Sequence, residues 1–108
     1  MTIQRTPVFR AHRIDGPYGV LVSLRLGQRP GPPSIVRLLT EGKDDPVIRF
    51  DLQRHIAEVL AGVARANREA GGSLQVESIE VVPDDTPRAG DAEQLAYEIA
   101  RAVLTGAL

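Results

Sequence analysis

Cysteine is absent from this chain, and aromatic residues make up only 4% of it. The first absence excludes disulfides, thiolate zinc sites and cysteine nucleophiles, and it suits a reducing compartment. The second means that the core must be built from Val, Leu, Ile and Ala. At 108 residues the chain can bury one such core. We therefore expect a single domain over residues 1–108, with residues 1–6 frayed.

Long apolar runs are also missing. No segment is long enough to span a bilayer, and residues 1–13 lack the apolar stretch of a signal peptide. The sequence therefore predicts a cytoplasmic protein with no membrane partner.

Motifs of enzyme sites are missing as well. The chain contains no GxxxxGK[ST] or GxGxxG nucleotide motif and no GxSxG nucleophile elbow. His55 precedes Glu58 by three residues, which could place two ligands on one helix face, but a zinc site needs at least three protein ligands. Asp84 and Asp85 are adjacent, so their side chains point apart, which disfavours joint acid–base work. We predict no catalytic residue, no metal site, no cofactor and no enzymatic activity.

The charge is unevenly distributed, although the net charge is only −1. Residues 1–40 hold six arginines against one aspartate, whereas residues 41–108 hold seven basic against thirteen acidic residues. Two interpretations are open. The first half could form a basic binding face, or the halves could pair within one sheet and cancel.

Four strands are predicted, at residues 7–13, 18–26, 34–40 and 76–82. The second shows the clearest alternation, with apolar side chains on one face at Tyr18, Val20, Val22, Leu24 and Leu26. Residues 27–33 hold three prolines and two glycines. This segment is either a stiff connection or a proline-rich ligand for another domain. Residues 41–46 read as a turn, in which Asp44 and Asp45 are turn residues or a weak cation site.

Two helices are predicted, at residues 52–70 and 92–105. Asp51 and Asp91 are their expected N-caps, and Gly71 ends the first. The buried stripe of the first helix is expected to comprise Leu52, Ile56, Val59, Leu60, Val63 and Ala66. The order β-β-β-α-β-α predicts a two-layer α+β sandwich, in which both helices cover one face of a four-stranded sheet.

The segment Gly16-Pro17-Tyr18-Gly19-Val20 and the strand after it resemble the glycine motif of the fourth domain of translation elongation factor G. The 47–71 region resembles that domain's central helix, and residues 76–104 resemble its closing strand and last helix. The resemblance implies a left-handed βαβ crossover. It also implies that residues 27–34 and 83–90 form two loops at one tip of the domain, the end that contacts the ribosome.

Two functions follow from these observations. The chain is either a non-enzymatic domain that binds the ribosome or structured RNA, or a module for protein interaction or homo-oligomerisation. RNA binding requires gathered cations, for which Arg25, Arg29, Arg37 and Arg88 are the candidates. Protein interaction requires uncovered apolar patches around Leu21, Leu38 or Leu108.

Overall fold

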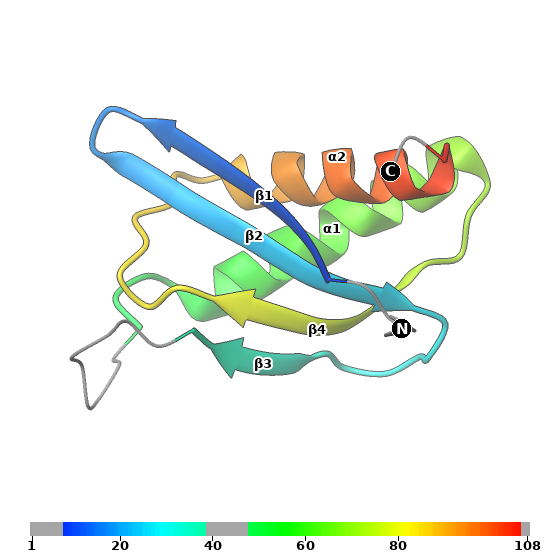
Figure 1. Ribbon diagram of the computed structural model, residues 1–108, viewed down its shortest axis with the longest axis horizontal. Helices are drawn as coiled ribbons and strands as arrows, with labels where there is room; N and C mark the ends of the chain where they lie inside the picture. The colour runs from blue at the N-terminus through cyan, green and yellow to red at the C-terminus, as the bar shows by residue number, and fades with distance from the viewer. Residues whose placement is uncertain (1–7, 39–47, 107–108) are drawn as a thin grey trace, which may run out of the picture.

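The computed structural model describes residues 8–38 and 48–106 of the chain. These residues form β1 (Val8–Asp15), β2 (Tyr18–Gly27), β3 (Ser34–Arg37), α1 (Leu52–Ala70), β4 (Gln75–Val81) and α2 (Asp91–Leu104) (Figure 1). This is the predicted element order. The predictions for residues 1–6, for the turn at 41–46 and for the end of the third strand at residues 39–40 lie outside the described residues.

The strands form one mixed sheet in the order β1-β2-β4-β3. β1 and β2 form an antiparallel hairpin, β2 is antiparallel to β4, and β3 is parallel to β4. In Figure 1, β3 and β4 both run to the left, α1 returns behind the sheet, and β4 lies above β3, so the crossover is left-handed. Parallel crossovers are right-handed in about 98% of cases. The hand is therefore unusual, and it is the one that the resemblance implies.

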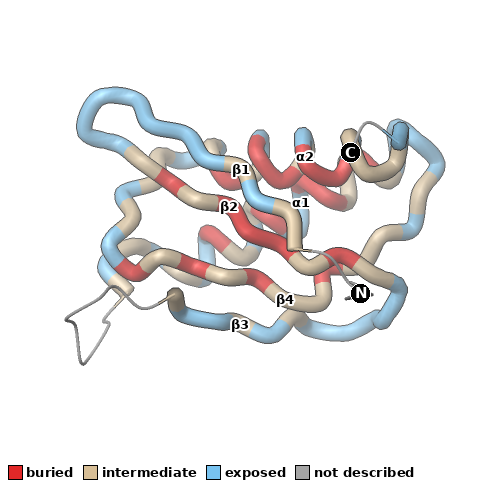
Figure 2. Tube along the Cα trace, in the orientation of Figure 1, coloured by how far each residue is buried: buried red, intermediate tan, exposed pale blue. Residues whose placement is uncertain are grey.

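Both helices pack on the same face of the sheet, which confirms the predicted two-layer α+β sandwich (Figures 1 and 2). Along β2 the side chains alternate as predicted. Val20, Val22 and Leu24 face the helices and are at most 1% exposed. They pack with aliphatic residues of β4, α1 and α2 to form the core. No described residue forms a layer over the opposite face of the sheet, which we call the open face.

The first helix begins and ends where the sequence predicts. The Arg54 N–H donates a hydrogen bond to Oδ1 of Asp51 at 3.0 Å, and Gly71 ends α1 with a φ of 68°. The predicted buried stripe is wrong at one position, because Leu60 is 39% exposed, whereas His55 is only 3% exposed. The reason is the neighbouring helix. α2 packs against the side of α1 that carries Gly62, which turns the buried face of α1 away from Leu60.

The second helix begins one residue earlier than predicted, and its N-cap is Gly90 rather than Asp91. Gly90 has a φ of 91°, a conformation that side-chain-bearing residues rarely adopt. The Asp91 carboxylate instead accepts from the Arg88 side chain, with Oδ2 and Nε 3.3 Å apart. It still lies in the first turn of the helix, where negative charge is favourable.

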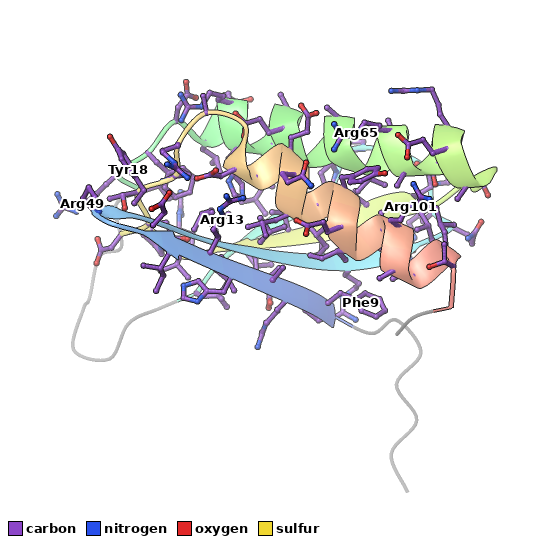
Figure 3. All side chains as sticks on the ribbon, turned by 90° about the horizontal axis from the view of Figure 1, so that it is seen from above. Phe9, Arg13, Tyr18, Arg49, Arg65 and Arg101 are labelled. Atoms are coloured by element: carbon purple, nitrogen blue, oxygen red, sulfur yellow. The ribbon has the colours of Figure 1, made fainter. Side chains whose placement is uncertain are left out.

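The two helices meet closely at Gly62. A Cβ atom at this position would overlap the Glu93 carbonyl oxygen and come within 2.9 Å of the Tyr97 nitrogen. Around the contact, Arg65 lies over the Tyr97 ring at 4.0 Å from its centroid. Farther along, Arg101 donates to Oε1 of Glu69 at 2.6 Å. These polar contacts follow the line where the helices meet (Figure 3), so α2 is held firmly beside α1.

Candidate functional site

The four arginines proposed for RNA binding do not gather in the structure. Arg25 lies on β2 and points to the open face, since its neighbours Leu24 and Leu26 are buried beneath the helices. Arg37 ends β3 on the edge of the sheet, and in register with the buried Val81 it lies on the helix side. Arg29 follows the C-terminal end of β2, and Arg88 lies between β4 and α2.

The two loops expected at one tip lie at opposite ends of the sheet (Figure 1). Residues 27–34 follow the end of β2, and residues 83–90 follow the end of β4. Because β2 and β4 are antiparallel neighbours, the ends of these strands point in opposite directions. The predicted tip is therefore wrong, and its two arginines, Arg29 and Arg88, do not form one cluster.

Arg88 is held by acidic neighbours. Its guanidinium lies 2.8 Å from Oδ2 of Asp15 and also contacts Asp91, and it lies 5.4 Å from the centroid of the Tyr18 ring. The hydrogen bond to Asp91, followed by the charges of both carboxylates, raises the pKa of Arg88. This side chain therefore ties the loop before α2 to the β1–β2 hairpin.

The acidic residues Asp84 and Asp85, in the same loop, also have hydrogen-bond or ion-pair partners. Asp85 accepts a hydrogen bond from the Leu21 N–H at 2.9 Å, and burial raises the pKa of its carboxyl group. The Thr86 backbone exchanges hydrogen bonds with Gly19. Asp84 pairs with Arg49 at 3.2 Å. These contacts hold the loop along β2 and border a pocket of about 350 Å³ with mixed polar and apolar lining at this end of the sheet.

A polar network crosses the centre of the open face. Arg10 donates from Nε to Ser23 at 3.1 Å and from Nη2 to Glu80 at 2.8 Å, and the Ser23 hydroxyl donates to the same carboxylate at 2.5 Å. The hydrogen bonds from Ser23 and Arg10 lower the pKa of Glu80. Here positive charge from the first half of the chain, at Arg10, is paired with negative charge from the second, at Glu80. The pair of Arg88 with Asp15 joins the halves with the opposite signs.

Apolar side chains on the open face are scattered around this network. Ile14 on β1 is 69% exposed and Val36 on β3 is 42% exposed, while Leu21 and Leu38 are half-buried. Val36 lies opposite Glu80 in the β3–β4 register, so charge interrupts the apolar surface. The predicted patch at Leu108 lies outside the described residues.

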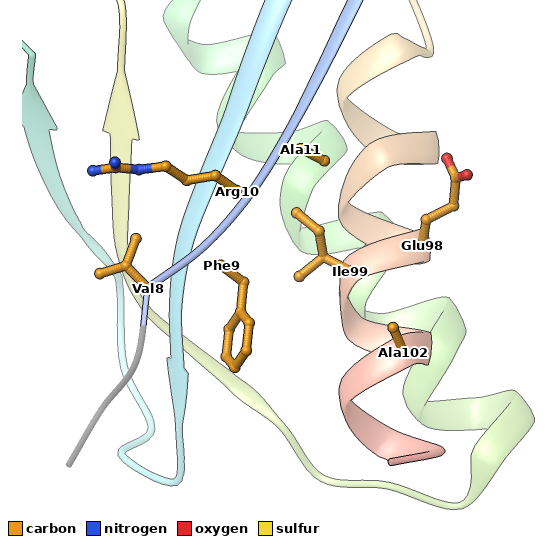
Figure 4. A pocket seen from close by; sticks show the side chains of 7 residues that line it. All are labelled: Val8, Phe9, Arg10, Ala11, Glu98, Ile99 and Ala102. Atoms are coloured by element: carbon orange, nitrogen blue, oxygen red, sulfur yellow. The ribbon is translucent and has the colours of Figure 1, made fainter. Parts of the chain in front are cut away.

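A groove of about 390 Å³ lies between β1 and α2 (Figure 4). Its apolar lining comes from Phe9 and Ala11 on the strand and from Ile99 and Ala102 on the helix, with Glu98 at the rim. In Figure 4 the Phe9 ring and Ile99 lie on facing walls. The sequence analysis missed this groove. The available signal was the alternation of Phe9 and Ala11 with charged residues along β1.

β1 is an edge strand, and its outward-pointing backbone groups can be identified. The Gly19 N–H and C=O both bond to Thr86, so they point toward the β4 side. Alternation along β2 directs the backbone groups of Val20, Val22 and Leu24 toward β1, where they meet Arg13, Ala11 and Phe9. The backbone groups of Val8, Arg10, His12 and Ile14 therefore point away from β2, to an edge that no described strand pairs with, beside the groove.

His55, for which the sequence analysis predicted no metal site, is buried away from solvent. Neither ring nitrogen has a hydrogen-bond partner among the described residues, and the Phe50 ring lies 5.3 Å away. Burial lowers the pKa of His55, and the charge of Glu58 opposes this shift. In the part of the chain that the structure describes, no three His, Asp or Glu side chains are grouped to hold a metal ion.

Within residues 8–38 and 48–106, neither helix combines the length and the apolar character needed to cross a membrane. Comparison of the chain with protein-family models, with curated proteins and with solved structures gave no match.

Proposed function

We propose that this chain is a non-catalytic protein-interaction domain that binds an extended segment of a partner beside β1. One observation carries the proposal: the outward backbone groups of β1 lie directly beside the apolar groove between β1 and α2. Added strands gain affinity from main-chain hydrogen bonds and specificity from pockets for alternate side chains. Here the eight-residue strand β1 supplies the main-chain groups and one wall of the pocket.

The form of β1 supports this role. Natural edge strands are commonly protected by prolines, bulges, very short length or charged side chains. β1 carries Arg10 and Arg13 and is preceded by Pro7, but it runs for eight residues without an internal proline, and its register with β2 is uninterrupted. The groove walls are also well supported, because α2 is packed against α1 at Gly62 and against β2 in the core. A rigid groove lowers the ordering cost of binding.

Binding to the ribosome or structured RNA stays a prediction that comes from the elongation-factor resemblance. The element order and the left-handed crossover favour the resemblance in fold. The candidate arginines are dispersed, however, and none of the four aromatic side chains lies on the open face. Phe9 and Tyr18 face the helix side, while Phe50 and Tyr97 belong to the helical layer. RNA-binding sheets commonly stack bases on such aromatic side chains.

Selection from a displayed library of random peptides tests the proposal. Peptides that bind the parent protein should lose binding to an Ala102→Phe variant, because the added ring fills the groove. Ala57→Phe is the matched control, since Ala57 is exposed on α1 and lies outside the groove lining. If selected peptides bind both variants equally, the groove is not the site. Both variants must show the melting behaviour of folded protein.

A further inference from the structure

We infer that the segment bound beside β1 is a single added strand that places one large, uncharged aliphatic side chain opposite Ala11. This inference rests on the proposed function and specifies the partner of the same site. The partner is an extended peptide segment with a Leu or Ile anchor, rather than a second copy of this chain. Three features of the site support this: the position of α2, the small side chain of Ala11 and the balance of charge around the groove.

The C-terminal half of α2 projects past the edge of the sheet. In Figure 1 this half of the helix lies beyond β1, on the side away from β2. A strand added to β1 would lie about 4.8 Å from it, over the projecting half of α2. A sheet buries its apolar face against a helical layer, and α2 already supplies that layer at the position of a fifth strand.

The projecting helix excludes a second copy of the chain from this edge. Two identical strands that pair antiparallel are related by a two-fold axis perpendicular to the sheet, so both helical layers lie on the same side. Each α2 would then project over β1 of the other copy. Paired strands are about 4.8 Å apart, whereas packed helices need about 8–10 Å between their axes. The two helices would collide, so the site fits a segment that has no helical layer of its own.

Ala11 leaves room for a side chain of the added strand. Residues directly opposite each other in a sheet direct their side chains to the same face, and Ala11 faces the helices because it is in register with the buried Val22. A residue opposite Ala11 therefore points into the groove, toward Ile99 and Ala102. Because Ala11 and Ala102 each contribute only a methyl group to the walls, a Leu or Ile side chain fits between them.

Only one such anchor position is available. The Phe9 ring lies on the wall facing Ile99 (Figure 4), so it already fills part of the groove, and the residue opposite Phe9 must be small. In the other direction along β1, the groove lining ends at Ala11. A residue opposite Arg13 therefore has no apolar space to enter.

The charges around the groove favour an uncharged anchor. Glu98 lies at the rim on α2, and Arg13 lies on the helix side of β1 (Figure 3). The Arg10 guanidinium is directed away from the edge, across β2 to Glu80. One negative and one positive side chain thus remain on this side of the edge, so they select neither an acidic nor a basic segment. Burial of apolar surface is the interaction that the groove offers.

The sequences of library peptides that bind the parent protein test the anchor. We expect Leu or Ile to be enriched at one position. Replacement of that residue by Ala should weaken binding at least about tenfold, because most of the buried apolar side chain is removed. Fluorescence anisotropy of labelled peptides measures the affinities. Replacement by Glu or by Lys should weaken binding as well, and a gain in affinity from either would overturn the uncharged anchor.

The protein side of the same contact is tested with Ala11→Val. The larger side chain takes up space that the anchor needs, so a peptide with Leu at the anchor should bind this variant at least about tenfold more weakly than the parent. The Ala version of the peptide should bind both proteins alike. Ala102→Val narrows the groove from the helix and should show the same selectivity.

His12→Val is the matched control for Ala11→Val. It adds a β-branched side chain at the next residue of β1, on the open face, and should leave the affinity of the Leu peptide nearly unchanged. Equal losses for the Leu and Ala peptides in both groove variants would mean that the anchor does not lie opposite Ala11, and the inference would be wrong.

Failure of the inference and failure of the proposed function give different results. If the selected peptides share no aliphatic anchor but lose binding to Ala102→Phe, the site stands and the anchor is wrong. If they bind Ala102→Phe as they bind the parent, the site itself is wrong. Sedimentation should show no dimer that these peptides dissociate, because such a dimer would place a second copy at β1 and overturn the inference.

Discussion

The two edges of the sheet differ in length and in what lies beside them. β1 has eight residues, a backbone edge that no described strand pairs with, and an apolar groove alongside. β3 has four described strand residues and follows a segment with three prolines, Pro30, Pro32 and Pro33, whereas Pro7 alone precedes β1. Short strands and nearby prolines are common ways to protect an edge from unwanted pairing. The comparison indicates that β1 offers the longer edge for pairing, with α2 as the wall of its groove.

The largest expected change in the free energy of unfolding comes from the contact that holds α2, the wall of the groove, against α1. Gly62→Val should lower the free energy of unfolding by about 3 kcal/mol, because its side chain would overlap the Glu93 carbonyl oxygen. Chemical unfolding measures the change. Ala61→Val is the control, since it adds the same β-branched side chain at an exposed position of the same helix. Equal stability of the two variants would mean that α2 is not held at Gly62, and the wall of the groove would be loose.

The next largest change in the free energy of unfolding is expected for Leu24, in the core beneath β1, compared with Leu60, at the periphery of the helical layer. Leu24 is fully buried and lies between Phe9 and Ile79 in the sheet register. Leu24→Ala should cost ~3 kcal/mol. Leu60→Ala should cost less than ~1 kcal/mol, because Leu60 is 39% exposed. Urea denaturation of both variants tests the ranking, and a greater cost at Leu60 would contradict it.

A moderate decrease in the free energy of unfolding is expected as the pH falls. The pKa of His55 is lowered in the folded protein, so the unfolded chain takes up the proton first as the pH falls. The stabilising contribution of neutral His55 should be complete above its ordinary pKa of 6.5 and should be lost progressively below that value. Thermal melts across this range measure it.

Substitution of His55 tests the source of this pH dependence. His55→Leu should flatten the stability profile around the ordinary histidine pKa, because it removes the group whose pKa is lowered on folding. A profile that keeps its slope in His55→Leu would contradict the assignment of this pH dependence to the core.

The smallest effect is expected at the ends of the sheet. An Arg29→Glu, Arg88→Glu double variant should bind structured RNA at low salt much as the parent does, because these residues lie at opposite ends and Arg88 is already paired with Asp15 and Asp91. A filter-binding assay measures this. A marked loss of RNA binding in the double variant would favour the ribosomal interpretation over the β1 edge.

Much of the fold could be predicted from local sequence. The alternation along β2 and the capping of α1 by Asp51 and Gly71 are set by neighbouring residues, and both are confirmed. Leu60 and Asp91 were misassigned for other reasons. The environment of Leu60 depends on contacts of α1 with α2, which is distant in the sequence. Asp91 binds Arg88, only three residues earlier, and the helical pattern does not distinguish this local contact from a cap.

The site was less predictable than the fold. The shared tip for residues 27–34 and 83–90 was wrong because β4 inserts beside β2 in antiparallel orientation, and strand order is not visible in local patterns. The groove was missed because its two walls, at Phe9 and Ile99, are separated by most of the chain. Only the alternation on β1 was available, and it does not reveal which helix lies beneath.

The most direct test of the account compares the two edges in one measurement. Backbone amide NMR spectra of the protein, titrated with a peptide selected from the displayed library, report every strand at once. The account predicts the largest shifts at the outward amides of β1, those of Arg10, His12 and Ile14, with the amides of β3 unchanged. Shifts confined to β3, or spread over the open face around Glu80, would contradict the assignment of β1 as the binding edge.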